Sequence, residues 1–268
     1  MEIYIGYTAR DSVSIAGLDI EKYAYQEYTE MRQGLVLAIN WGFDGLLGLT
    51  PPWNTDSIGY PTYTSRLLQQ DNLEEKVFST KFPRFLHEEG EFMVGDSNSD
   101  LYTGEFRTIK ALDDAEGPGT YEGRWNVPIS SITLNTSLPL RLPTPNCTAV
   151  LLSEAILALP RQFVQNFTEI IGAEPFSWWW QTVPCDRRAY LPELTFEIGG
   201  HNFSINAFDY TFEWEVPRDG YGIMCVLAVE GGEMDGNDCI GLGTPFLKGF
   251  YERFDLKERT IGFAELKR

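Results

Sequence analysis

The alternation of apolar and polar residues along the chain predicts β-strands joined by tight turns. Residues 12–20 alternate through Val13, Ile15 and Leu18, the period of two that suits a strand with one buried face. Residues 195–204 have the pattern of a β-hairpin that turns at two adjacent glycines. Further short strand candidates are residues 34–40 and 91–95. These patterns favour an all-β protein.

Two short stretches have the pattern of a helix. Residues 65–70 form one candidate. Residues 160–171 form the better one, because Pro160 suits a first helical position and Gly172 supplies a stop. The apolar residues that would line one face of this helix are Phe163, Val164, Phe167, Ile170 and Ile171.

The composition agrees with a strand-rich globular protein of acidic character. The 268 residues are 43% hydrophobic and 14% aromatic, and 25 glycines and 15 prolines supply turns. A formal charge of −18 argues against nucleic acid as a partner, because proteins that bind nucleic acid are usually basic. The acidity suits an acidic compartment, but it also keeps a protein in solution, so both readings stay open.

The second half of the chain carries the marks of a secreted or vacuolar glycoprotein. It holds all four cysteines, which permit two disulfides in an oxidising compartment. Four Asn-x-Ser/Thr sequons lie there at Asn135, Asn146, Asn166 and Asn202. The first seven residues do not form a signal peptide, and no window is long and apolar enough to span a membrane.

The sequence lacks the motifs of several enzyme classes. It has no Gly-x-Ser-x-Gly, His-Glu-x-x-His, phosphate-binding glycine loop or Gly-x-Gly-x-x-Gly. No Cys-x-x-Cys occurs, and the two histidines, His87 and His201, have polar surroundings, so we expect neither a metal site nor a cofactor. The run from Trp178 to Trp180 is either a platform for sugar or peptide or a set of side chains shared between core and lobe packing.

Several segments follow one another in order over nearly the whole chain and resemble the pepsin-like aspartic peptidases (family A1). They are residues 43–49 (Phe-Asp-Gly-Leu-Leu-Gly-Leu), 90–95 (Gly-Glu-Phe-Met-Val-Gly), 102–104 (Tyr-Thr-Gly), 125–127 (Trp-Asn-Val), 132–135 (Ile-Thr-Leu-Asn), 191–196 (Leu-Pro-Glu-Leu-Thr-Phe), 240–247 (Ile-Gly-Leu-Gly-Thr-Pro-Phe-Leu), 254–256 (Phe-Asp-Leu) and 261–264 (Ile-Gly-Phe-Ala). One such segment alone is a weak signal, but the ordered set is strong.

The resemblance implies an all-β, bilobal pepsin-like fold with a truncated N-terminal lobe. Residues 1–112 would be the remnant of that lobe and residues 121–268 the C-terminal lobe. The acidic and then Gly/Pro-rich stretch 113–119 would be a surface loop near their boundary. Residues 6–18 resemble the outgoing strand of the family's active-site flap, so the strands that bear the first catalytic aspartate would precede Met1.

The family's mechanism requires two aspartates, each in an Asp-Thr/Ser-Gly triplet, that share one proton around a water. Anchored on Pro160, the second triplet of this chain begins at Leu151; anchored on Cys147, it begins at Leu152. Neither residue is an acid, and the nearest carboxylate, Glu154, lies beyond the expected turn. The resemblance therefore assigns no catalytic residue to this chain.

Two glycines fit a structural part of the same site. In this fold each catalytic loop is braced by a crossing strand that ends in two apolar residues and a glycine. Gly48 and Gly243 match that position in the two lobes. Glycine is suited to it because the missing side chain lets another backbone pass closely.

The family activity implied is hydrolysis of peptide bonds in peptides or proteins at acid pH, by a monomer without a cofactor. We expect this chain to be inactive. One alternative is a non-catalytic pseudo-peptidase that binds peptide, glycan or protein, and another is a gene model whose true start lies upstream.

The resemblance also implies a disulfide between Cys185 and Cys225. If the strands around Leu151 and Gly243 run side by side, as this fold requires, Cys147 and Cys239 come within bridging distance.

Overall fold

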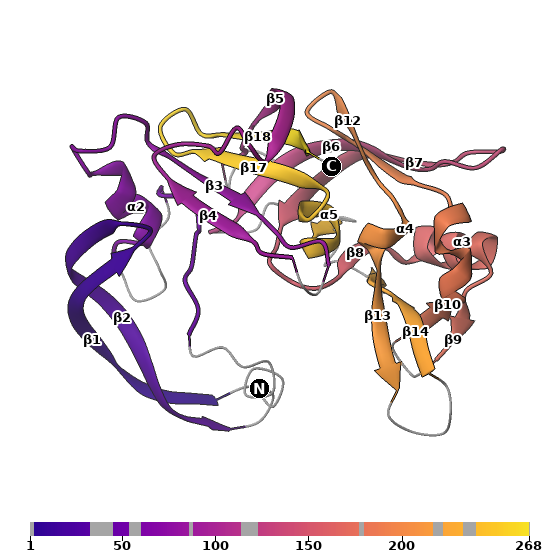
Figure 1. The fold of residues 1–268 in the computed structure, drawn as a ribbon, viewed down its shortest axis with the longest axis horizontal. Coiled ribbons are helices and arrows are strands. Elements are labelled where there is room, and N and C mark those ends of the chain that lie inside the picture. The colour runs from indigo at the N-terminus through magenta and orange to yellow at the C-terminus, as the bar shows by residue number, and fades with distance from the viewer. Residues whose placement is uncertain are drawn as a thin grey trace. The chain divides into compact units, whose positions relative to one another are not determined.

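The computed structural model describes residues 3–32, 45–53, 60–85, 88–113, 123–176, 180–216, 222–232 and 240–267. Two compact units make up the chain, Met1–Lys76 and Val77–Arg268. Strands predominate in both units and helices are few (Figure 1). The all-β prediction is confirmed.

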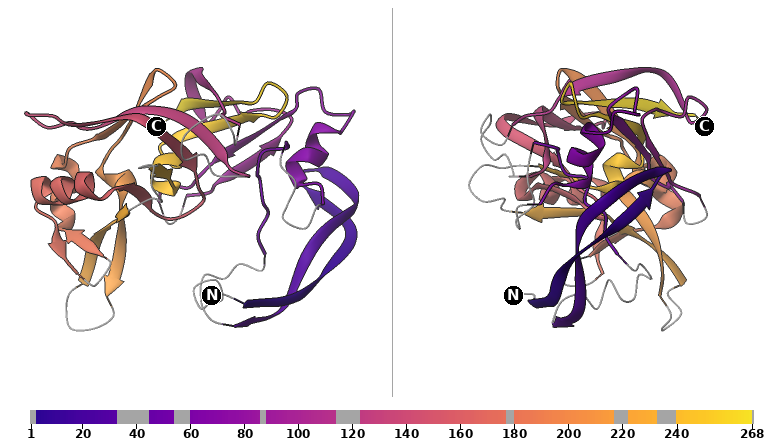
Figure 2. Two further views of the ribbon diagram at one scale, coloured as in Figure 1. Left: turned by 180° about the vertical axis from the view of Figure 1, so that it is seen from behind. Right: turned by 90° about the vertical axis from the view of Figure 1, so that its left-hand side faces the viewer.

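The first unit is built on a long antiparallel hairpin, seen as a curved ribbon in Figures 1 and 2. Its strands are β1 (Ile3–Ile15) and β2 (Leu18–Arg32), and the short helix α2 (Tyr63–Leu68) follows later in the chain. The hydroxyl of Tyr63 donates a hydrogen bond to the carbonyl of Ile15 (3.3 Å), next to the hairpin turn. The small core of the unit includes Leu18, Ile20, Tyr63 and Leu67.

The pattern predicted one strand over the alternating stretch 12–20, but the structure divides this stretch between β1 and β2. It contains the turn of the β1–β2 hairpin at Ala16 and Gly17, whose φ angles are 52° and 76°. A strand cannot continue through two residues of positive φ, and glycine adopts such a φ without steric cost. The apolar alternation continues across the turn because Ile15 and Leu18 face each other in the ladder.

A seven-stranded sheet forms the centre of the second unit. In spatial order it runs β12 (His201–Ile205), β11 (Leu194–Ile198), β6 (Trp125–Leu134), β7 (Leu140–Leu151), β16 (Ile240–Leu242), β8 (Leu157–Pro160) and β15 (Val229–Gly232). The pair β16–β7 and the pair β15–β8 are parallel, and the other pairs are antiparallel. The β11–β12 hairpin turns at Gly199 and Gly200, as predicted.

A second sheet joins the middle of the chain to its C-terminal strands. Its spatial order is β4 (Glu91–Val94), β3 (Val77–Lys81), β17 (Phe250–Asp255), β18 (Thr260–Leu266) and β5 (Tyr102–Lys110), and Figures 1 and 2 show the yellow strands β17 and β18 between β3 and β5. Because β3, β4 and β5 share this sheet, the compact units divide after Lys76. The sequence placed the boundary of the lobes between residues 112 and 121, and the assignment of 1–112 and 121–268 to two lobes stays a prediction.

A third sheet and the remaining helices complete the second unit. The sheet runs β13 (Thr211–Val216), β14 (Gly222–Leu227), β10 (Gln181–Val183) and β9 (Glu174–Pro175). The helical segments are α3 (Arg161–Ile171), the 3₁₀ turn η1 (Cys185–Tyr190), α4 (Ala207–Tyr210) and α5 (Thr244–Leu247). No described helix has the length and apolarity to cross a lipid bilayer.

Helix α3 confirms the predicted helix and its stop signal, but the helix begins at Arg161, one residue after the predicted start at Pro160. Pro160 is its N-cap residue, and Gly172 ends it with a φ of 66°, in the left-handed region. Phe163 and Phe167 are buried as predicted, but Ile170 is 49% exposed. Ile170 therefore lies outside the buried face to which the apolar pattern assigned it.

Aromatic side chains pack between the two larger sheets of the second unit. Phe203, Phe246, Phe250 and Phe263 form one cluster with ring centroids 5.2–6.2 Å apart. In a second cluster Phe78 stacks on Phe254 at 4.5 Å, and Trp125 contacts both rings. These clusters fix the two sheets against each other, because aromatic pairs combine large buried area with preferred geometry.

The predicted disulfide between Cys185 and Cys225 is confirmed. It joins the start of η1 to β14, with the two Cα atoms 5.2 Å apart. We expect replacement of both cysteines by serine to lower the free energy of unfolding by about 2–4 kcal/mol, because a cross-link of this span restricts the unfolded chain. Urea unfolding of the variant and of the oxidised wild-type chain measures the difference.

The reduced wild-type chain is the control for this experiment. It should unfold at nearly the same urea concentration as the double serine variant, because both lack the Cys185–Cys225 cross-link. Equal midpoints for the oxidised wild type and the variant would contradict the expected contribution.

Candidate active site

The position predicted for the second catalytic aspartate lies at the end of β7. Leu151 is the last residue of that strand and is paired with Trp125 of β6 on one side and Leu242 of β16 on the other. It is buried, with 9% of its surface exposed. The next residue, Leu152, leaves the strand but donates its backbone N–H to the carbonyl of Leu242 (3.1 Å). Both candidate positions are therefore apolar and held against β16.

The chain then makes a tight loop around the end of β16. Residues 152–156 connect β7 to β8, and β16 lies between these two strands, parallel to β7 and antiparallel to β8. The backbone N–H of Thr244 donates to the carbonyl of Glu154 (2.7 Å), which fastens the loop to the residue after Gly243. A loop fixed in this way can place a side chain reproducibly.

Gly243 is the point of closest approach between the loop and the crossing strand. A Cβ atom at this position would lie 2.0 Å from the carbonyl oxygen of Ile156 and 2.4 Å from that of Glu154. The backbone φ of Gly243 is −80°, which any residue can adopt. The glycine is therefore needed for space rather than for conformation. This is the kind of approach that the sequence predicted here; its part in a catalytic site stays a prediction.

Gly48 has different surroundings, although the sequence gave it the same role. A Cβ at Gly48 would meet no atom within 4 Å among the described residues, and the side chain of Leu46 before it is 86% exposed. Phe43 and Asp44, which begin the same motif, lie outside the described residues. The described part of the chain thus shows no loop braced by Gly48.

Carboxylates are scarce at the loop. The 268 residues contain no Asp-Thr-Gly or Asp-Ser-Gly triplet. Glu154 is exposed, and its carbonyl rather than its side chain accepts the hydrogen bond from Thr244 at the start of α5. Within the described ranges, no three His, Cys, Asp or Glu side chains are arranged to hold a metal ion.

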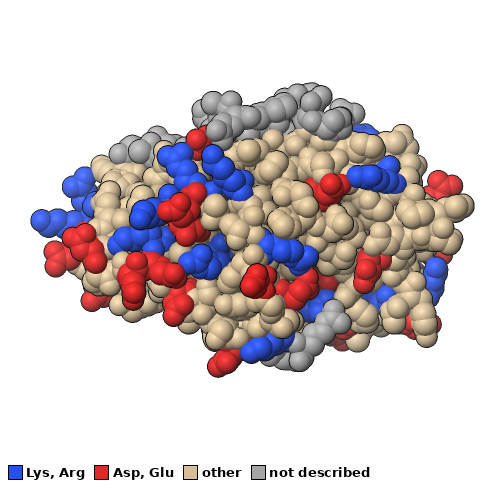
Figure 3. All heavy atoms as spheres, turned by 90° about the horizontal axis from the view of Figure 1, so that it is seen from above, with Lys and Arg blue, Asp and Glu red and all other residues tan. Residues whose placement is uncertain are grey.

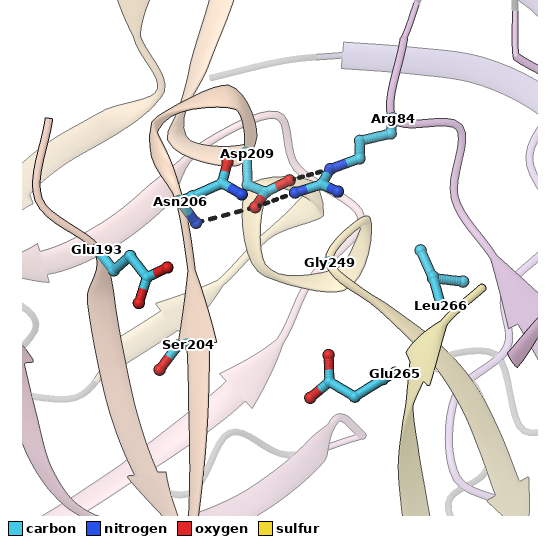
Figure 4. A pocket seen from close by; sticks show the side chains of 8 residues that line it. All are labelled: Arg84, Glu193, Ser204, Asn206, Asp209, Gly249, Glu265 and Leu266. Carbon is cyan, nitrogen blue, oxygen red and sulfur yellow. Dashed lines mark hydrogen bonds and ion pairs between the residues drawn. The ribbon is translucent and has the colours of Figure 1, made fainter. Parts of the chain in front are cut away.

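A polar pocket lies elsewhere in the second unit and was missed by the sequence analysis. Its lining residues, labelled in Figure 4, are Arg84, Glu193, Ser204, Asn206, Asp209, Gly249, Glu265 and Leu266. Arg84 donates from Nε and Nη2 to the two carboxylate oxygens of Asp209, at 2.6 and 2.8 Å. The Asp209 side chain is 2% exposed and also accepts the backbone N–H of Asn206 (2.9 Å).

This pocket has a structural explanation. Asn206 and Asp209 form a capping box at the start of α4, and Arg84 ties that helix to the segment after β3. The Asn-x-x-Asp spacing was a local signal for the cap, but no local pattern could identify Arg84 as a partner 125 residues away. None of residues 151–156 lines the pocket.

The predicted glycosylation sites have unequal surroundings. Asn135 and Asn202 are exposed, whereas Asn166 lies in α3 and accepts a hydrogen bond from Gln162 (3.1 Å). The side chain of Asn146 lies outside the described residues. Glycosylation at these four positions stays a prediction.

The structure describes two of the remaining predicted candidates, His201 and Trp180. His201 is exposed, and His87 lies outside the described residues. Of the tryptophan run, Trp178 and Trp179 lie outside them as well. Trp180 is half-buried, and its ring meets that of Phe212 edge-on at 5.6 Å. On the face shown in Figure 3, acidic and basic side chains are interspersed rather than gathered by sign.

The pairing of β7 with β16 bears on the second predicted disulfide. Ile240 lies opposite Ala149, so the strands that follow Cys147 and Cys239 do run side by side. Cys239 itself lies outside the described residues, and its bond to Cys147 stays a prediction. We expect non-reducing peptide mapping of the oxidised chain to join these two cysteines. A peptide that joins Cys147 to Cys185 would contradict the pairing.

Comparison with known proteins connects these features to one family. The family model described as eukaryotic aspartyl protease matches residues 3–266. Vacuolar protease A of Aspergillus fumigatus is 30% identical over 98% of this chain and 62% of its own length. Probable vacuolar protease A of Arthroderma benhamiae shows the same identity and coverage, and cathepsin D of Canis lupus familiaris is 26% identical over 98% of this chain and 64% of its own. The chain thus spans less than two thirds of these relatives.

Proposed function

Because the chain belongs to the eukaryotic aspartyl protease family, we propose that it keeps the framework of a pepsin-like site but does not itself hydrolyse peptide bonds. One observation carries this proposal. The loop after β7 is clamped around Gly243 as a catalytic loop should be, yet it begins with Leu151 and Leu152 instead of an aspartate. The family activity, peptide-bond hydrolysis at acid pH, belongs to relatives that have the acid pair.

The chemistry of the reaction explains why leucine cannot serve. One carboxylate must take a proton from the attacking water while a second carboxylic acid gives one to the scissile carbonyl. An aliphatic side chain does neither. Glu154 offers a single exposed carboxyl, and residues 152–156 contain no second acid. The chain's own residues therefore build and orient the loop without performing a proton transfer.

A binding role is the second candidate. Aromatic side chains on the third sheet (β13–β14–β10–β9) and next to it favour a binding role. Trp214 is 47% exposed, and its ring lies 6.1 Å from that of Phe212. The ring of Trp180 contacts the Phe212 ring as well. In this reading the chain is a pseudo-peptidase that binds a peptide, glycan or protein. The vacuolar relatives and the charge of −18 support an acidic vacuole, or secretion, as its location.

The test is a digestion assay with the purified full chain. Denatured haemoglobin is incubated with it between pH 3 and pH 5, with and without a pepstatin-type inhibitor, and an active pepsin-like enzyme serves as the positive control. We expect no release of acid-soluble peptide beyond the blank. Cleavage that the inhibitor blocks would overturn the proposal, and Glu154→Gln would then be the first variant to examine.

Restoring one acid should not restore activity. Leu151→Asp places a lone carboxyl in a site that is 91% buried, and the reaction needs two. We expect no haemoglobin cleavage and a loss of about 1–3 kcal/mol of stability from burial of the polar group. The matched control is Leu151→Asn, which has nearly the same shape but cannot ionise. Cleavage that the pepstatin-type inhibitor blocks, seen with Leu151→Asp but not with Leu151→Asn, would contradict this expectation.

A further inference from the structure

A glutamate lies in the core of the second unit, where a charged side chain is unexpected. Glu252 is in the middle of β17, paired with Thr80 of β3 and Phe263 of β18, and is fully buried. Side chains alternate along a strand, so Glu252 shares its face with Phe250 and Phe254. Those two residues belong to the two aromatic clusters, and the carboxyl therefore lies between apolar groups.

The carboxyl of Glu252 has little to compensate for its burial. Its Oε2 accepts a hydrogen bond from the Thr80 hydroxyl (2.7 Å). Its Oε1 is buried and has no hydrogen-bond partner in the described part of the chain. No Lys, Arg or His in that part forms an ion pair with Glu252. An ionised carboxylate in such a site is strongly disfavoured.

Neighbouring charged and titratable groups belong to the other face of the sheet and have partners there. On β17, Tyr251 donates to Glu91 (2.9 Å) and Arg253 contacts Asp255. On β3, the residue after Thr80 is Lys81, which pairs with Glu88 (2.6 Å). On β18, the residues on either side of Phe263 are a glycine and an alanine. None of these groups supplies a counter-charge to Glu252.

Burial raises the pKa of Glu252 well above its usual value, while hydrogen bonds from Thr80 and from its own backbone amide act in the opposite direction. In the folded chain the carboxyl is therefore neutral at pH values where the unfolded chain has it ionised. The neutral acid also costs less to bury than the carboxylate, because it carries no charge that would need a cation beside it.

We propose that Glu252 is a proton-dependent lock of the fold, which holds one proton while the chain is folded and releases it when the chain unfolds. Glu252 titrates at a higher pH in the folded chain than in the unfolded chain. In the pH window between these two titrations, the folded state binds more protons than the unfolded state. Stability therefore falls as the pH rises through this window and is fully present below it. The lock favours the folded chain in acidic surroundings and lowers its free energy of unfolding as the pH rises toward neutrality.

The test compares the wild-type chain with Glu252→Gln, which keeps the shape but cannot ionise. For the wild type we expect the folding equilibrium constant from urea titrations to fall more steeply as the pH rises above the range in which an unfolded glutamate titrates than it does for the variant, with a limit of about tenfold per pH unit for one proton per molecule. The matched control is Glu258→Gln, an exposed position on the β17–β18 turn, which should keep the wild-type slope. Parallel pH dependence in wild type and Glu252→Gln would overturn the proposal.

A second measurement needs no variant and covers the case in which Glu252→Gln does not fold. Infrared difference spectra of the wild-type chain at pH 6.5 should show the carbonyl band of a protonated carboxylic acid in the folded state, and this band should vanish on unfolding. Thr80→Val removes the hydroxyl that binds the carboxyl, so the band should shift in frequency. A folded spectrum at pH 6.5 without any protonated-carboxyl band would contradict the lock.

Discussion

Gly243→Ala should destabilise the second unit by about 3 kcal/mol or more, at the upper end of the cost of overpacking. The added methyl group would lie 2.0 Å from one backbone oxygen and 2.4 Å from another. Neither obstacle is a side chain that can rotate away, because both belong to the loop that connects β7 and β8. The loop would have to move and would lose the hydrogen bond from Thr244 to Glu154. Urea unfolding followed by tryptophan fluorescence measures the loss.

The control is Gly48, which follows two apolar residues just as Gly243 nearly does in its own motif. Gly48→Ala should change stability by less than about 0.5 kcal/mol, because its Cβ meets open space among the described residues. A large difference between the two variants is the expected result. Similar losses of stability for Gly243→Ala and Gly48→Ala would mean that residues 152–156 move aside at little cost and are not packed tightly against Gly243.

Asp209→Ala should cost about 3–5 kcal/mol, the range for breaking a buried ion pair from one side. The substitution leaves the guanidinium of Arg84, whose side chain is 18% exposed, without its carboxylate. It also removes the acceptor for the backbone N–H of Asn206 and so half of the capping box of α4. Chemical denaturation of the full chain, with midpoint and slope both fitted, gives the change.

Asp113→Ala is the matched control for the ion pair. Asp113 also accepts two hydrogen bonds from an arginine, Arg259, at 2.8 and 3.0 Å, but the two side chains are 40% and 44% exposed. Solvent screens such a pair, so its loss should cost no more than about 1 kcal/mol. Equal losses for the two aspartate variants would show that burial does not set the strength of the Arg84–Asp209 pair.

Local signals in the sequence predicted elements well wherever the backbone itself limits the choice. Pro160 and Gly172 marked the ends of α3 because one fixes φ and the other tolerates a left-handed φ. The glycine pair at 199 and 200 marked the β11–β12 turn for the same reason. The turn at residues 16–17 was missed because apolar residues happen to alternate through it.

Contacts between distant segments could not be predicted from such signals. Gly48 and Gly243 follow the same apolar-apolar-Gly pattern, and only the packing of residues 154–156 against one of them distinguishes the two. The run Phe-Tyr-Glu-Arg-Phe of β17 likewise does not show whether Glu252 or Arg253 faces the core. That choice depends on which face of the sheet carries the aromatic clusters, a property of five strands from two parts of the chain.

Family resemblance supplied what local pattern could not, and it did so through ordered motifs rather than single residues. It identified the Cys185–Cys225 bond, which depends on a known order of strands. It also assigned the second catalytic position to Leu151 or Leu152, which stays a prediction. The family resemblance could not predict features that belong to none of its motifs. Neither the Arg84–Asp209 pair nor the buried Glu252 belongs to a motif, so each emerged only from the packed structure.

The central claim, that the loop after β7 lacks a paired acid, is tested most directly by the binding of a transition-state mimic. A pepstatin-type inhibitor gains its affinity from two carboxyl groups that hold the hydroxyl of a tetrahedral centre, whether or not turnover can be detected. Calorimetric titration of the full chain at pH 4, beside an active pepsin-like enzyme under the same conditions, measures that affinity. We expect no saturable heat from this chain, because Leu151 and Leu152 stand where the second catalytic aspartate is predicted. Tight binding of one inhibitor per chain would contradict the account.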